Sequence, residues 1–289
     1  MSFHWSRGDV TIGDGFLRIA LEQIGKAIAG AENNTESPER RVHEARRRCK
    51  KLRALFRLVR PDFAAYDSEN AFVRDAARGL AQARDMRVAR GTLVGLMQWA
   101  GRPIDLELGG GADVEVEGLT RFAEQMRALE ARSADWHVGR IDIDTLAKGL
   151  KQTYQRGRWT KRLAEKHRTD EAFHEWRKYA KYHWNQLGLL EYCAEDVLPS
   201  AHKSAGELAE LLGLHHDLAM LDELLATAPG TLGVEIDVGF AREAAARRQQ
   251  EYEAKIAALG LQVFAETPKA LKARFSAYLE GSMAREAAE

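Results

Sequence analysis

The sequence predicts an all-α protein built as two tandem four-helix bundles that an internal repeat relates by a pseudo-two-fold axis. Three observations support this prediction. Apolar residues recur with helical periodicity along most of the 289 residues, only 6 prolines interrupt them, and one basic motif occurs twice. No alternating apolar pattern is long enough to predict a sheet. A chain of this length can bury a large core.

The predicted helices are bounded by ordinary start and stop signals. Ser37-Pro38 places a capping side chain before a first-turn proline, and Arg60-Pro61 ends the same helix. Glycine-containing loops are expected at 102–118 and 229–239. The predicted helices cover residues 12–30, 38–60, 70–100, 119–137, 144–168, 170–196, 200–228, 240–260 and 268–284.

A basic motif appears once in each half of the chain in the same register. Residues 42–53 read VHEARRRCKKLR, and residues 173–181 read FHEWRKYAK. Matched positions lie 131 residues apart, and they are His43 and His174, Arg46 and Arg177, and Lys50 and Lys181. We therefore expect a single domain over 1–289, with a first bundle over 10–137 and a second over 144–284.

The first copy of the motif predicts a groove lined by cations. Along the helix at 38–60, apolar residues from Val42 to Val59 follow the spacing of a core-facing seam. A row of cations repeats that spacing one residue later, about 100° around the helix axis. The cations thus border the buried seam. The chain has 43 basic and 43 acidic residues, so this local excess of positive charge predicts an anionic ligand, and its ladder form suits a chain of phosphates.

The second copy is less regular than the first. After Lys181 its next positions in the row are Trp184 and Gly188, which carry no charge. The preceding predicted helix adds cations on one face, namely Lys151, Arg158 and Arg162. Binding is therefore expected to depend most on the first copy.

The two motifs resemble those of the CHAD family, the conserved-histidine α-helical domain. Residues 80–85 (LAQARD) and 212–218 (LGLHHDL) resemble two further elements of that family, in the family's order. The resemblance spans nearly the whole chain and implies a basic surface that binds inorganic polyphosphate on cytoplasmic polyphosphate granules. It implies phosphate contacts from Arg46, Arg47, Lys50, Arg53, Arg177, Lys178 and Lys181, and makes His43 and His174 the namesake histidines.

The residue pattern and the resemblance together give the candidate site. The expected polyphosphate ligands are His43, Arg46, Arg47, Lys50, Arg53, Arg57, Lys151, Arg158, Arg162, His174, Arg177, Lys178 and Lys181. The residues expected to orient them are Arg84, Asp85, His216 and Asp217. No cofactor or metal ion is predicted. Aromatic residues are not interleaved with these cations in the sequence, which disfavours a single-stranded nucleic acid as ligand.

Two other functions stay open. His216-Asp217 is typical of metal-ligand pairs in helical phosphohydrolases, although the equivalent position in the first half is Arg84. No metalloprotease, phosphate-loop or paired-cysteine motif is present, so we expect binding without catalysis. A nucleic-acid-binding helical module is the second alternative. No apolar stretch of about 18 residues predicts a membrane span, and the two cysteines fit a reduced cytoplasmic setting.

Overall fold

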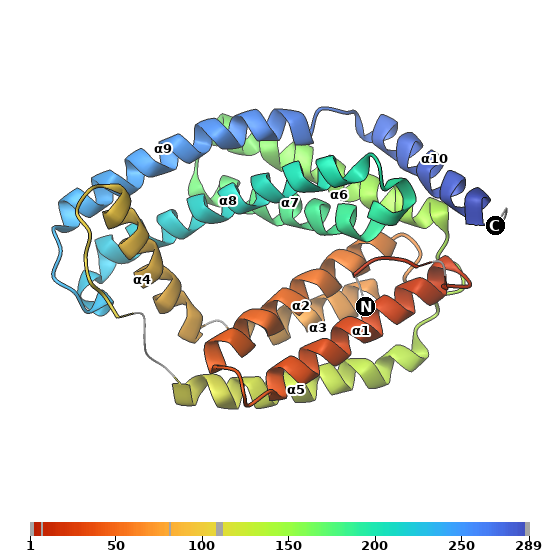
Figure 1. Ribbon diagram of the computed structural model, residues 1–289, viewed down its shortest axis with the longest axis horizontal. Helices are drawn as coiled ribbons and strands as arrows, with labels where there is room; N and C mark the ends of the chain where they lie inside the picture. Colours follow the sequence, from red (N-terminus) through yellow and green to blue (C-terminus); the bar gives the residue numbers. More distant parts are fainter. Residues whose placement is uncertain (1–2, 7, 81, 108–111, 287–289) are drawn as a thin grey trace.

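The computed structural model describes residues 3–6, 8–80, 82–107 and 112–286, with side chains throughout except at 82–85, 112–116 and 286. Over these residues the chain is helical and contains no strand, so the predicted all-α class is confirmed (Figure 1). None of the described helices carries an apolar stretch long enough to cross a lipid bilayer.

In chain order the helices are α1 (Ile12–Glu32), α2 (Pro38–Val59), α3 (Tyr66–Arg78), α4 (Gln82–Trp99), α5 (Ala112–Arg132), the 3-10 turn η1 (Ser133–Asp135), α6 (Ile143–His167), α7 (Asp170–Leu190), the 3-10 turn η2 (Glu191–Ala194), α8 (Leu198–Thr227), the 3-10 turn η3 (Pro229–Leu232), α9 (Val238–Val263) and α10 (Pro268–Glu286).

Side-chain caps fix where several of these helices begin. The Ser37 hydroxyl accepts a hydrogen bond from the backbone N–H of Arg40 at 3.4 Å, and Pro38 is the first residue of α2, as predicted. Asp142 and Thr145 form a reciprocal capping box at the start of α6. These caps satisfy backbone donors that the first turn of a helix leaves without a partner.

The single helix predicted over 70–100 is wrong, because the chain forms α3 and α4 there. Gly79 ends α3, and its backbone N–H donates to the Asp75 carbonyl at 3.2 Å. Helix α3 packs against α2 and α5, whereas α4 packs against α8 and α9. Helical periodicity continues on both sides of the break, so the pattern alone does not reveal the change in direction.

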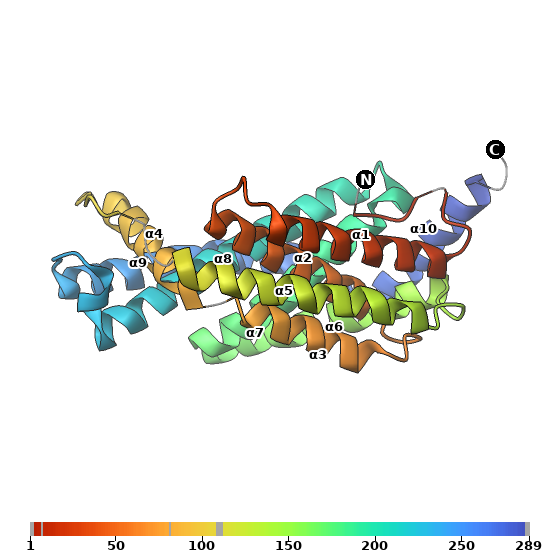
Figure 2. The same cartoon turned by 90° about the horizontal axis from the view of Figure 1, so that it is seen from below.

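Helix α4 completes a second apolar cluster at one end of the molecule. Leu93 and Leu96 of α4 pack there with Leu221 and Leu225 of α8 and Ala244 of α9. Both views place α4 beside α8 and α9, at the end of the molecule away from α10 (Figures 1 and 2). Thus α4 lies within 10–137 by sequence but packs on helices of 144–284, and the repeat of two four-helix bundles stays a prediction.

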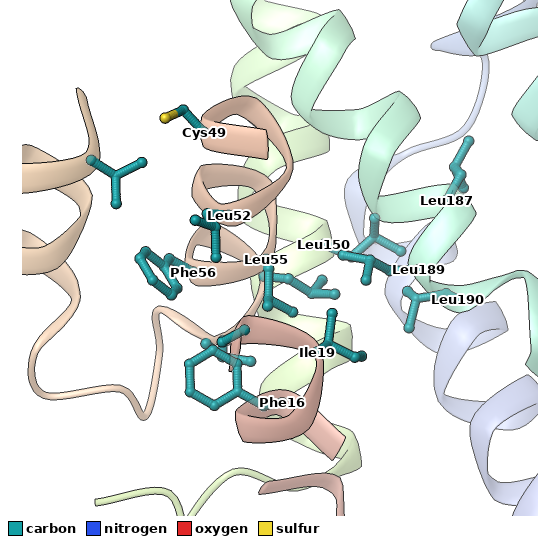
Figure 3. Packing of buried hydrophobic residues seen from close by; sticks show 14 of the residues in the cluster. Phe16, Ile19, Cys49, Leu52, Leu55, Phe56, Leu150, Leu187, Leu189 and Leu190 are labelled. Atoms are coloured by element: carbon teal, nitrogen blue, oxygen red, sulfur yellow. The ribbon is translucent and has the colours of Figure 1, made fainter. Parts of the chain in front are cut away.

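Helix α2 joins the two halves of the chain through the main core. It packs against α1, α3 and α5 from the first half and against α6 and α7 from the second. Figure 3 shows Leu55 of α2 pointing toward Leu150 of α6 and Leu189 of α7, and all three are fully buried. One apolar cluster therefore extends across both halves, and their relative position is set by close packing.

Helices α2 and α6 approach each other closely at Gly149. A Cβ atom added there would lie 1.7 Å from the carbonyl oxygen of Leu58. Only glycine fits at this position without moving one helix away from the other. The contact places the end of α2 directly against α6.

Replacing Gly149 with alanine is expected to lower the free energy of unfolding by at least about 1–3 kcal/mol, since the two helices must separate. Gly25→Ala in α1 is the matched control, because nothing lies within 4 Å of an added Cβ there. That substitution should raise the free energy of unfolding by roughly 0.5–1 kcal/mol. Urea denaturation followed by helical circular dichroism measures both, and equal effects would contradict the close approach.

Candidate anion-binding site

Helices α2 and α7 lie side by side with opposite directions. The Gln186 side-chain amide of α7 donates to the Ala54 carbonyl of α2 at 3.2 Å. Closer to the C-terminal end of α2, the Arg57 guanidinium carbon lies 4.4 Å from the ring centroid of Tyr182, which precedes Gln186 in α7. The antiparallel arrangement places the start of the first basic motif beside the end of α7.

A pocket of about 410 Å³ opens between these two helices, and we call it the α2–α7 pocket. Its lining combines cations from both halves of the chain, with Lys50 from α2 and Lys181 from α7. The full lining is Phe3, His43, Arg47, Lys50, Lys51, Lys181, Trp184, Asn185, Gly188, Glu191 and His202. Four of the predicted ligands (His43, Arg47, Lys50 and Lys181) are thus brought together.

Lys51 also lines this pocket and was not among the predicted ligands. Its ammonium lies 4.5 Å from the ring centroid of Phe3. Burial, followed by the charges of Arg47 and Arg48, lowers the pKa of Lys51 to about 8. Lys51 therefore loses its positive charge as the pH rises through about 8. Helical periodicity cannot predict the contact between Lys51 and Phe3, because the two residues are far apart in the sequence.

Two other predicted ligands of α2 face α3. The Arg46 guanidinium donates to the Ala77 carbonyl at 3.0 Å, and Arg53 donates through Nε to the Asn70 side chain at 3.1 Å. Both arginines are half-buried. They hold α3 against α2, and neither lines the α2–α7 pocket.

Arg57 lines a second pocket, of about 700 Å³, which we call the α2–α6 pocket. Aromatic rings from α6 and α7 lie there beside Arg57 of α2 and Arg60, which follows α2. The lining is Arg57, Arg60, Pro61, Gln152, Thr153, Gln155, Arg156, Trp159 and Tyr179. Aromatic rings therefore do accompany these cations in the folded protein, contrary to the prediction from sequence, because the rings come from neighbouring helices. Arg60, Arg156 and Trp159 were not predicted as ligands.

The predicted run on α6 is placed differently. Arg158 donates to the Ala265 carbonyl at 3.5 Å, on the side of α6 that faces the α9–α10 connection. Arg162 is exposed, and neither it, Lys151 nor Arg158 lines the α2–α7 or the α2–α6 pocket. The structure does not bring these three residues together with the basic motif of α2.

The start of the second motif packs on α8. The rings of His174 and His216 have centroids 4.3 Å apart, and Arg177 lies against Gly213. Burial lowers the pKa of His216 to about 4, with smaller contributions from the nearby His174 and Arg177. The pKa of His174 is lowered by burial and then by Lys178 and Arg177. Their surroundings therefore favour the neutral form of both rings.

The remaining predicted residues have separate positions. Lys178 is exposed and forms an ion pair with Glu175 of its own helix. Asp217 is half-buried beside His216 on α8. Arg84 and Asp85 lie at the start of α4, outside the described side chains. Among the described residues, no group of three or more His, Cys, Asp or Glu side chains is arranged to hold a metal ion.

Removing the positive charge of Lys178 is expected to raise the pKa of both His174 and His216, because Lys178 disfavours a second positive charge beside it. Titration of the histidine ring signals by NMR in Lys178→Met measures the effect. Lys203→Met, near the start of α8, is the control. Unchanged histidine pKa values in Lys178→Met would contradict the described electrostatics.

Comparison with known proteins agrees with the fold and the motifs. Residues 17–226, more than half of the chain, match the CHAD domain family. Among curated proteins, none matches the chain. The extent of the family match shows that this chain belongs to the CHAD domain family.

Proposed function

We propose that this protein binds inorganic polyphosphate in the α2–α7 pocket and does not catalyse its turnover. The observation that carries the proposal is that cations from both halves of the chain line one pocket. Membership of the CHAD domain family supports it, since the resemblance of the motifs predicts the same ligand. The proposed setting is the cytoplasm, at polyphosphate granules.

The chemistry of the pocket suits a chain of phosphates. Arg47 offers a guanidinium that matches phosphate oxygens in a bidentate manner, and Lys50, Lys51 and Lys181 offer mobile ammonium groups. Lys50 lies about two helical turns after His43, roughly 10 Å along α2. Donor groups spread over that distance favour an extended polyanion over a single small anion.

Lys50 and Lys181 give the most direct test of the proposal because they come from different halves of the chain. We expect the double change Lys50→Glu and Lys181→Glu to weaken long-chain polyphosphate binding by at least about 100-fold, since a charge-assisted contact contributes about 1.5–3 kcal/mol. Calorimetric titration with polyphosphate of defined lengths measures the loss. In the unmodified protein, affinity should also fall steeply with salt.

The matched control carries the same change in charge elsewhere, as Arg121→Glu on α5 and Lys269→Glu on α10, two exposed positions outside both pockets. Retained affinity for long-chain polyphosphate in the Lys50→Glu and Lys181→Glu variant would contradict the proposal. So would binding of duplex or single-stranded DNA as tight as that of polyphosphate. Release of phosphate from polyphosphate, lost in His216→Ala, would instead support the phosphohydrolase alternative.

Polyphosphate binding is further expected to take up protons near pH 8. About half of Lys51 is neutral there, and bound phosphates would raise its pKa by favouring the charged ammonium. Affinity should therefore increase as the pH falls from 9 to 7. Calorimetry in buffers with different ionisation enthalpies measures the uptake. It should disappear in Lys51→Arg, which stays charged, and equal uptake in both proteins would place Lys51 away from the ligand.

A further inference from the structure

The α2–α6 pocket differs in chemistry from the α2–α7 pocket, and the two share no lining residue. Its lining includes three arginines, two aromatic rings and two side-chain amides. A polyphosphate chain uses the arginines alone, because it has no ring to stack and no base edge to hydrogen-bond. The aromatic rings and amides therefore indicate a ligand with a flat ring system as well as phosphates.

The three arginines are held by rings instead of by carboxylates. The guanidinium carbon of Arg156 lies 4.0 Å from the Trp159 ring centroid, and that of Arg60 lies 4.7 Å from the centroid of Tyr66. Arg57 lies over Tyr182. In the described part of the chain, none of these arginines forms an ion pair with Asp or Glu. Cation–π contacts leave the guanidinium edges available for phosphate oxygens.

A buried polar atom provides a second, independent sign of a ligand. Thr153 lines the pocket, yet its side chain is only 2% exposed, and its hydroxyl has no hydrogen-bond partner among the described residues. A buried hydroxyl without a partner costs about 1–3 kcal/mol. A polar group of a bound ligand would satisfy it.

The exposed part of the pocket provides the surface for a base. Trp159 is 44% exposed although it is large and apolar. Gln152 and Gln155 of α6 line the pocket and are exposed. Each side-chain amide can donate and accept hydrogen bonds. Nucleobases stack on tryptophan rings and on guanidinium planes.

We propose that the α2–α6 pocket binds a nucleoside triphosphate, with its base on Trp159 and its phosphates on Arg57, Arg60 and Arg156. The volume of about 700 Å³ lies within the range of small-molecule sites. This inference does not depend on polyphosphate binding in the α2–α7 pocket.

Adenosine triphosphate and inorganic tripolyphosphate separate the contribution of the base from that of the phosphates. Calorimetric titration of the full chain should show adenosine triphosphate binding about tenfold more tightly, the effect of one stacked base. Trp159→Ala should abolish this difference, and Trp159→Phe, which keeps a ring, should preserve it. Trp99→Ala, at a tryptophan that is 36% exposed on α4, is the matched control and should have no effect.

Equal affinities for the two ligands would overturn the proposal, as would a base preference that survives in Trp159→Ala. The Lys50→Glu and Lys181→Glu variant should keep its affinity for adenosine triphosphate. Loss of that affinity would place the nucleotide in the α2–α7 pocket and also overturn the proposal. Polyphosphate binding can fail in its own test while the nucleotide preference persists, so the two proposals are distinguishable.

Thr153→Val replaces the buried hydroxyl with a group of similar shape. It should weaken adenosine triphosphate binding several-fold while leaving the melting temperature equal or higher, because the unliganded protein loses only an unsatisfied group. A lower melting temperature with unchanged affinity would show that the hydroxyl stabilises the fold and does not contact the ligand.

Discussion

The buried contact of α2 with α6 and α7 is the constraint on which the rest of the structure depends. Leu55, Leu150 and Leu189 are fully buried at this junction, and Gly149 lets the two backbones approach closely. The cations of α2 and α7 lie near one another in the α2–α7 pocket, although like charges repel. Burial of these leucine side chains stabilises the arrangement against that repulsion. Packing of the apolar core thus keeps these positive charges close together, whereas in a flexible chain they would move apart.

The same junction explains why the basic motif of α2 has several roles. Arg46 and Arg53 face α3 and bond to it, Lys50 lines the α2–α7 pocket, and Arg57 lines the α2–α6 pocket. Because α2 is surrounded by several helices, different cations of its basic motif face different neighbouring helices. Cations that form one continuous motif in the sequence therefore have different surroundings in the folded protein.

Sequence periodicity predicted the helices well because burial of an apolar face is local information. It also predicted a cationic groove, and the structure brings Lys50 and Lys181 into one pocket. It could not reveal the break at Gly79, since both flanking segments have the same period. Nor could it place Trp159 of α6 in the pocket that Arg57 of α2 lines, because that proximity arises from tertiary packing between residues about a hundred positions apart.

The position of α4 has a consequence for how the chain can be divided. A cut in the connection between α5 and α6 would give an N-terminal piece whose α4 has lost its apolar partners on α8 and α9. The C-terminal piece would carry the complementary uncovered surface. The two pieces are therefore expected to recombine by docking that helix, so that the protein behaves as a pair of mutually completing fragments and not as two autonomous folding units.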